Sequence, residues 1–254
     1  MAPDGRTSRP PRTSVWLAER PAPKRTRAVA QEQPGGLDRE RITAATVRLL
    51  DANGMAKFSM RRLAAELGVT AMSVYWYVDS KDDLMELALD SVEGELTLPD
   101  LDDEDADWRE QLRQLTSEYR RMLVSHPWVS QMIGQYLNVG PKAMAFTNAA
   151  QGVMRRAGLP ADRLTGALAA VFQFVYGFGT IEANWNGRCA AAGISTDAYY
   201  RQIYAKVEGR PEYADSLALR EAGGSGSVEE MRQQDFEVAL DLLIAGIEAM
   251  RSRP

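Results

Sequence analysis

The feature that most constrains the fold is the stretch at residues 59–78, which reads SMRRLAAELGVTAMSVYWYV. Ser59 can accept a hydrogen bond from a free backbone N–H of a first helical turn. Apolar residues then recur at i, i+3, i+4 and i+7 as far as Leu67, which is the pattern of one helical face. Gly68 follows, where a helix end favours a residue that tolerates positive φ. The pattern predicts a helix over residues 60–67.

A second short helix is predicted directly after this turn. Thr70 offers an N-cap, and residues 71–77 make about two turns at 3.6 residues per turn. Val74 is the natural inward anchor of this helix. Two helices joined by a short turn that contains glycine are typical of a helix-turn-helix. A helical hairpin in an ordinary all-α protein is the alternative.

The side chains left facing outward favour DNA as the partner. Tyr and Ser hydroxyls beside arginines suit phosphate oxygens, and small residues at a helix N-terminus let it enter a major groove. These outward residues are Arg61, Arg62, Ala71, Met72, Ser73, Tyr75 and Tyr77. Burial is the other interpretation of the aromatic residues, and we expect one of them, Trp76 in part, to belong to the core.

The run MRRLAAELGVTAMSVYWYVDSKDDL resembles the DNA-binding domain of the tetracycline-repressor (TetR) family of bacterial regulators. The shared pattern is an Ala-Leu helix, Gly-Val, a short recognition helix ending in aromatic residues and Val, and a Lys inside the next helix. Residues 37–89 fit this pattern throughout. The resemblance implies a set of DNA-binding residues. Met72 departs from the polar residues that are common at its position in the family, and we expect it to contact a thymine methyl. Base edges would be contacted by Arg61, Ala71, Met72 and Ser73, and phosphates by Thr70, Tyr75, Tyr77 and Lys81, with Trp76 beside them.

The distribution of charge agrees with a DNA-binding N-terminal part. The whole chain carries a net charge of −5, but residues 1–37 hold seven basic and three acidic side chains. Residues 38–81 hold seven basic and five acidic ones, so the remainder of the chain is strongly acidic. A basic DNA-binding end on an acidic body is the polarity expected of a DNA reader.

Residues 1–37 are rich in Pro and Arg and are predicted to be a disordered basic arm. We expect Lys24, Arg25 and Arg27 to contact the minor groove or flanking phosphates, as arginine arms do in homeodomains. The alternative is a spectator tail. One detail stands out, because residues 15–17 (Val-Trp-Leu) form an apolar island that could dock on the folded part of the chain.

Composition excludes several other classes of protein. We find no apolar run near ~18 residues, so no membrane span is expected, and the N-terminus lacks the apolar core of a secretory signal. A single cysteine, Cys189, excludes an intramolecular disulfide, and a cytoplasmic location is expected. With His126 as the only histidine, no metal site and no cofactor are predicted.

The rest of the chain is predicted to be all-α, with roughly nine or ten helices and no strand. Asp38 caps a helix that stops at residues 53–54, and Ser80 opens a helix to about residue 96 with Asp83 in the capping-box position. Three domains are predicted: a basic arm (1–37), a helix-turn-helix domain (38–81) and a larger ligand-binding and dimerisation domain (82–254). Further helices are predicted over residues 108–125, 129–137, 141–157, 162–185 and 227–250, with a loop at 186–226.

Residues 108–185 also resemble the C-terminal domain of the tetracycline-repressor type, through SHPWVSQMIGQ, GPKAMAF, the turn at 155–159 and VYGFGTIE. The resemblance implies a homodimer in which the two long C-terminal helices form a four-helix bundle with a second subunit. Small residues on these helices independently permit close helix approach within an apolar surface that needs cover. They are Gly166, Ala169, Ala170, Gly177, Ala239, Ala245 and Gly246.

Aromatic and methionine residues are spread over consecutive helices of this domain. Such residues at helical spacing are most often core, but some could line a ligand cavity with a few polar groups. The predicted ligand-binding set is Tyr119, Met122, Trp128, Met132, Tyr136, Asn148, Phe172, Gln173 and Glu182. Glu182 aligns with a glutamate near the magnesium of the tetracycline repressor. The histidines that bind drug and metal there have no counterpart here, so a magnesium–tetracycline effector is not expected.

These observations predict a homodimeric transcriptional repressor that binds a palindromic double-stranded DNA operator and is released by a small organic effector. A dimeric small-molecule-binding protein with a degenerate helix-turn-helix is the alternative, and salt-dependent operator binding would separate the two. An enzyme would need a nucleophile–base or carboxylate pair, which the sequence does not suggest.

Overall fold

The structure is a computed structural model of the whole chain, and it describes residues 14–17, 36–136, 138–222 and 226–251. The described residues are helical, with one isolated bridge between Ile133 and Tyr136 and no strand. This confirms the predicted all-α fold. The chain divides into two compact units, Met1–Gly94 with Met132–Met144, and Glu95–Gln131 with Ala145–Pro254. The predicted domain boundaries at residues 37 and 81 stay a prediction.

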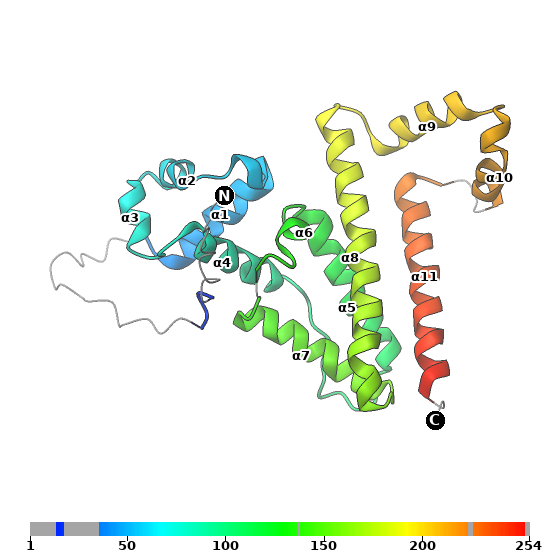
Figure 1. Cartoon of the computed structure of the whole chain (residues 1–254), viewed down its shortest axis with the longest axis horizontal. Helices are drawn as coiled ribbons and strands as arrows, with labels where there is room; N and C mark the ends of the chain where they lie inside the picture. Colours follow the sequence, from blue (N-terminus) through cyan, green and yellow to red (C-terminus); the bar gives the residue numbers. More distant parts are fainter. Residues whose placement is uncertain (1–13, 18–35, 137, 223–225, 252–254) are drawn as a thin grey trace, which may run out of the picture. The chain divides into compact units, whose positions relative to one another are not determined.

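The first unit is built from a series of helices (Figure 1). Their ends follow the local capping chemistry. The Asp38 carboxylate accepts from the Arg41 N–H at 2.6 Å, and Ser59 Oγ accepts from the Arg62 N–H at 3.2 Å. Gly68 ends the helix before it with φ 69°, a conformation that a residue with a Cβ rarely adopts. The elements are α1 (Arg39–Asn53), η1 (Met55–Lys57), α2 (Met60–Leu67), α3 (Ala71–Tyr75) and α4 (Lys81–Glu93).

The predicted cap at the start of α4 is present, with Asp83 bonded to the Ser80 hydroxyl and to the backbone N–H of Asp79. The N–H of Asp83 donates to Ser80 Oγ at 3.1 Å, and the Asp83 carboxylate accepts from the Ser80 hydroxyl at 2.9 Å and from the Asp79 N–H at 2.9 Å. The core of the unit then forms where α1 packs on α4 and on α2. Its fully buried side chains include Ile42, Leu50, Leu63, Val74, Leu84, Met85 and Leu89.

Two sequence predictions in this unit are wrong in detail. The recognition helix ends at Tyr75 instead of residue 77, and α4 ends at Glu93 instead of residue 96. The early end of α3 decides the position of Trp76, which is 82% exposed and not part of the core. Val74 and Val78 fill the interior on either side of the turn, so the indole is left outside.

The second unit is dominated by three long helices. α8 (Ala161–Ala191) packs along α5 (Trp108–Ser125) and against α11 (Val228–Arg251), as Figure 1 shows in yellow, green and red. The core between them includes Leu112, Leu115, Val171, Val175, Phe236, Leu240 and Ile244. The remaining elements are α6 (Val129–Met132), α7 (Pro141–Arg156), α9 (Thr196–Val207), η2 (Pro211–Tyr213) and α10 (Ala214–Ala222), of which α6 and α7 have residues in both units.

Two further helix predictions need correction. The segment at 186–226, predicted as a loop, contains the end of α8 together with α9 and α10. No α9 residue is buried, although Tyr200, Ile203, Tyr204 and Val207 recur at the helical spacing i, i+3, i+4 and i+7. The helix predicted over 129–137 stops at Met132, because Gly134 adopts φ 85°, outside the helical region.

The expectation of no apolar run near ~18 residues is also wrong. α8 is long and apolar enough to cross a membrane by length and composition alone, and 17% of its most apolar window is buried. One face of the helix nevertheless packs on α5 through Val171 and Val175, which are completely buried. One such helix is weak evidence of a membrane span, because a mostly buried core helix passes the same test.

Candidate nucleic-acid interface and effector region

The recognition helix α3 has one inward anchor and an exposed outer face. Val74 is completely buried, whereas Met72 is 68% exposed. Thr70 Oγ1 caps the helix by accepting from the Ser73 N–H at 3.2 Å, and it also contacts Ser73 Oγ at 2.9 Å. The cap fixes the first turn, where Ala71 and Ser73 are half-buried. A short capped helix with small residues at its N-terminus has the shape that enters a major groove.

Large aromatic side chains at the end of α3 and on the turn after it are exposed to an unusual degree. Trp76 is 82% exposed, Tyr75 43% and Tyr77 37%. Clustered apolar groups on a soluble surface mark an interaction site more often than a structural role. The sequence prediction placed these three residues among the DNA contacts, and their exposure is compatible with that prediction.

Basic side chains lie on the elements before and after α3. Arg61 is exposed on α2, and the neighbouring Arg62 donates through Nη1 to the Lys57 carbonyl at 3.4 Å. Lys81 is the first residue of α4. Its ammonium lies 5.5 Å from the centre of the Phe58 ring, which is a cation–π contact. The predicted contacts from Lys24, Arg25 and Arg27 lie outside the described residues.

In the second unit, two of the predicted ligand residues meet in a cluster of rings. Tyr119 on α5 lies edge-on to Phe172 on α8, with 5.6 Å between ring centres. Phe146 on α7 completes the cluster, at 5.4 Å from Tyr119 and 5.3 Å from Phe172. All three rings are half-buried. The sequence prediction did not include Phe146, although its type and its place in a helix were visible.

Glu182 has a structural partner. Arg120 Nε donates to Glu182 Oε2 at 2.8 Å, and Arg120 Nη1 donates to Gln233 Oε1 at 2.8 Å. The guanidinium also lies 5.0 Å from the centre of the Phe178 ring and 4.7 Å from that of Phe236. The carboxylate that the sequence analysis proposed as a ligand group therefore ties α8 to α5.

The other predicted ligand residues are dispersed. Asn148 and Gln173 are exposed, whereas Met122 and Trp128 are both 1% exposed and belong to the packed interior. Met132 and Tyr136 are in the first unit, where the Tyr136 hydroxyl donates to Asp82 Oδ1 at 3.2 Å. Desolvation by burial, with the nearby Asp82 carboxylate, raises the pKa of Tyr136 to about 12. The ligand assignment of the set as a whole stays a prediction.

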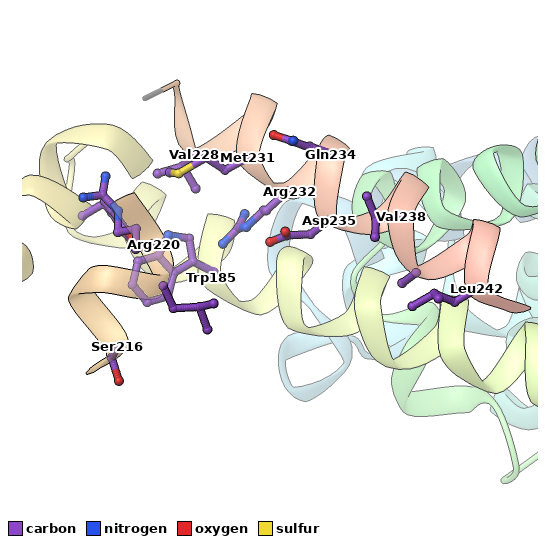
Figure 2. Close-up of a pocket in the computed structure, with 13 residues that line it drawn as sticks. Trp185, Ser216, Arg220, Val228, Met231, Arg232, Gln234, Asp235, Val238 and Leu242 are labelled. Atoms are coloured by element: carbon purple, nitrogen blue, oxygen red, sulfur yellow. The ribbon is translucent and has the colours of Figure 1, made fainter. Parts of the chain in front are cut away.

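A cleft of about 600 Å³ opens in the second unit, between the end of α8 and helices α9, α10 and α11. Figure 2 shows Trp185 and Arg232 on facing walls, and the Arg232 guanidinium lies 5.8 Å from the centre of the Trp185 indole. Arg220 of α10 lies over the Tyr200 and Tyr204 rings, at 4.6 and 4.4 Å. This cleft was not predicted from the sequence, because the segment that carries α9 and α10 was expected to be a loop.

A metal site in the described residues would need a cluster of side chains that could bind the ion. No group of three His, Cys, Asp or Glu side chains there could hold a metal ion.

Comparison with known proteins identifies both parts of the chain. Residues 42–88 match the family model for bacterial regulatory proteins of the tetR family, and residues 98–251 match that for the tetracyclin repressor-like C-terminal domain. An HTH-type transcriptional regulator of Saccharopolyspora erythraea is 36% identical over 213 residues, which is 84% of this chain and 85% of that protein. The HTH-type transcriptional repressor DrrR1 of Streptomyces coeruleorubidus is 35% identical over 138 residues, 54% of this chain and 51% of that protein.

Solved structures show the same fold. The Streptomyces coelicolor TetR family protein ActR, crystallised in complex with actinorhodin, superposes with a TM-score of 0.68 at 25% identity. The alignment covers 86% of this chain and 100% of ActR.

Proposed function

This chain belongs to the TetR family of bacterial regulatory proteins, and we propose that it is a homodimeric repressor that binds a palindromic operator and releases it when a small organic effector binds. Its relatives are named as transcriptional regulators, which favours regulation over catalysis as the role of this chain. A repressor acts where bacterial DNA lies, so the proposed location is the cytoplasm.

The observation that carries the DNA-binding part of the proposal is the outer face of α2 and α3. A capped recognition helix exposes Met72, Tyr75 and Trp76, while Arg61 extends from the helix before it. In the proposed complex Arg61, Ala71, Met72 and Ser73 face base edges, and Thr70, Tyr75, Tyr77 and Lys81 contact phosphates. Base contacts would set sequence preference, whereas phosphate contacts would set register and salt dependence.

Homodimerisation is supported by two exposed stripes of small and apolar residues. On α8, a Cβ added at Gly166 or Gly177 would meet no described atom within 4 Å, and Ile181 is 70% exposed. On α11, Val238 is 55% and Leu242 70% exposed. An apolar two-helix face of this kind needs cover, and the face of a second copy has the same composition.

The effector part of the proposal rests on the ring cluster of Tyr119, Phe146 and Phe172. Half-buried rings from three helices offer stacking surfaces to a large, flat, partly apolar compound. The complex of ActR with actinorhodin supports an organic compound as the class of effector. Release would follow if the effector favours a conformation of the dimer that cannot contact both half-sites, because a ligand shifts the population toward the state it binds better.

An electrophoretic shift assay on DNA from upstream of the gene tests this proposal. The protein should retard that fragment in preference to an unrelated one of equal length, and candidate organic compounds should be screened for the loss of the shifted band. A chain that binds candidate compounds but retards both fragments equally would instead be a small-molecule-binding protein with a degenerate helix-turn-helix.

A further inference from the structure

Residues 14–17 near the N-terminus dock on the first unit. The Ser14 hydroxyl and the Val15 N–H both donate to Glu86 Oε2 on α4, the latter at 2.9 Å. Ser14 is 6% exposed and Val15 7%, and Glu86 itself is 9% exposed. Two donors from adjacent residues thus converge on one carboxylate oxygen in a sheltered position. Hydrogen bonds to an ionised acceptor are roughly twice as strong as neutral ones.

The same four residues close a turn of their own. The Leu17 N–H donates to the Ser14 carbonyl at 3.0 Å, and the Trp16 N–H donates to Ser14 Oγ at 3.3 Å. The backbone N–H groups of Val15, Trp16 and Leu17 therefore all have hydrogen-bond acceptors. Complete pairing of backbone donors is expected of an ordered segment and not of a tail lying loosely on a surface.

A contact with a second helix makes the docked segment a bridge. The Arg39 guanidinium at the start of α1 lies 5.7 Å from the centre of the Trp16 ring. Attraction between a cation and the face of an indole favours this arrangement. The segment is thus held by α4 through the Ser14 hydroxyl and the Val15 N–H, and by α1 through the Trp16 indole. α1 and α4 form the most extensive helix pair of the unit.

The docking is selective among the apolar residues of the segment. Val15 is 7% exposed, whereas Leu17 is 60% exposed. An apolar island that merely adhered to the protein would have no reason to bury one aliphatic side chain and leave the other in water. The pattern indicates a defined seat for Val15.

We propose that residues 14–17 are an intramolecular strap that ties α4 to α1 and restrains both helices in the folded protein. The strap goes beyond DNA binding, because its contacts belong to α1 and α4 whereas the proposed base contacts come from α2 and α3. Its expected consequence is that local opening of the α1–α4 pair becomes less frequent.

Hydrogen exchange of the full chain, free of DNA and effector, tests the strap. The backbone N–H groups of Val15, Trp16 and Leu17 should exchange at least tenfold more slowly than in a peptide of the same sequence. Val15→Ala should remove most of this protection and should also speed exchange in α4. Leu17→Ala is the matched control, and it should leave both rates within about twofold of the unmodified chain because Leu17 is exposed.

A second pair of variants tests the acceptor. Glu86→Ala should abolish protection of residues 15–17, whereas Glu40→Ala, which removes an exposed carboxylate from α1, should preserve it. Ser14→Ala leaves every helix unchanged in sequence and guards against misfolding of the Glu86 variant; it should also lower protection. Unprotected N–H groups at residues 15–17 in the unmodified chain, or equal effects of the Val15 and Leu17 variants, would overturn the strap. Neither outcome depends on whether the protein binds an operator.

Discussion

Arg120 and Glu182 form an ion pair inside the second unit, with 2.8 Å between Nε and Oε2 and side chains that are 10% and 11% exposed. A charge in such surroundings is costly unless it is paired and hydrogen-bonded. The pair joins α5 to α8, and these two helices make the most extensive contact of the unit. Glu182 is thus a residue on which the fold depends.

Removing the carboxylate should therefore destabilise the protein. Glu182→Ala leaves Arg120 buried without its counter-charge, and breaking a buried pair in this way costs about 3–5 kcal/mol. Denaturant unfolding should show this loss, and Glu182→Gln should lose less because its amide oxygen can still accept. Unfolding free energies equal to that of the unmodified chain would show that the pair does not stabilise the native state.

The effector proposal is tested best at the ring cluster. Phe172→Leu keeps an apolar side chain in a half-buried site, so stability and operator binding should change little while release by an effector weakens at least tenfold. Trp128 is a poorer choice, because it is 1% exposed and its truncation would leave a core cavity costing about 3–5 kcal/mol. Normal release of the Phe172 variant, measured by band shift, would place the effector elsewhere.

Glu93 at the end of α4 should make stability depend on pH. Desolvation by burial, followed by the nearby Asp90 carboxylate, raises the pKa of Glu93 from 4.5 to about 8. Because the folded-state pKa is the higher one, the contribution to stability is fully present below about pH 4.5 and is lost as the pH rises through about 8.

The matched variant for this effect is Glu93→Gln. At about 1.4 kcal/mol per pKa unit, the variant should gain up to a few kcal/mol relative to the unmodified chain near pH 8 and much less at pH 5. Thermal unfolding of both proteins between pH 5 and 8.5 measures the difference. A difference that stays constant over this range would show that Glu93 titrates normally.

Contacts in the DNA-binding surface should separate into two classes. Arg61→Ala should lose about 1–3 kcal/mol of operator affinity and relax the preference at one base pair, as expected for a base contact. Tyr75→Phe should weaken operator and unrelated DNA alike, because it removes a phosphate contact. Arg155→Ala removes the same charge from an exposed position in the second unit and is the control. Unchanged affinity in both test variants would refute the assignment.

Close helix approach in the proposed dimer can be tested on α8. A Cβ added at Gly177 meets no described atom within 4 Å in one chain, and Gly177→Leu replaces a poor helix former, so the protomer should fold at least as well. In the dimer, the added side chain would hold the helices apart and weaken association at least tenfold by sedimentation equilibrium. Gly187→Leu makes the same change about ten residues further along this helix, beyond Ile181, and it should leave association unaltered. Equal association of both variants would argue against this face.

Local chemistry explains why the first unit was predictable from sequence. The caps at Ser59 and Ser80 and the left-handed Gly68 depend on neighbours within a few residues, so α2 and the start of α4 were predicted to the residue. Trp76 was misplaced because its exposure depends on where α3 ends, which tertiary packing of Val74 and Val78 decides.

Long-range contacts account for what the sequence did not reveal. The apolar island at residues 15–17 was visible, but its acceptor Glu86 lies about 70 residues further along the chain and carries no local mark. Phe146 was overlooked for the same reason, because only the fold brings α5, α7 and α8 together at one set of rings. No described side chain of α9 or α10 is buried, and the helical spacing of Tyr200, Ile203, Tyr204 and Val207 in α9 was overlooked.

The most direct test of the central claim is a fluorescence anisotropy titration of upstream DNA and of a scrambled fragment at several salt concentrations. The account predicts two protomers per palindromic site, an affinity at least about 10³-fold higher for the upstream DNA, and a logarithmic affinity that falls linearly with the logarithm of salt concentration. Equal affinity for the two fragments at every salt concentration would contradict it.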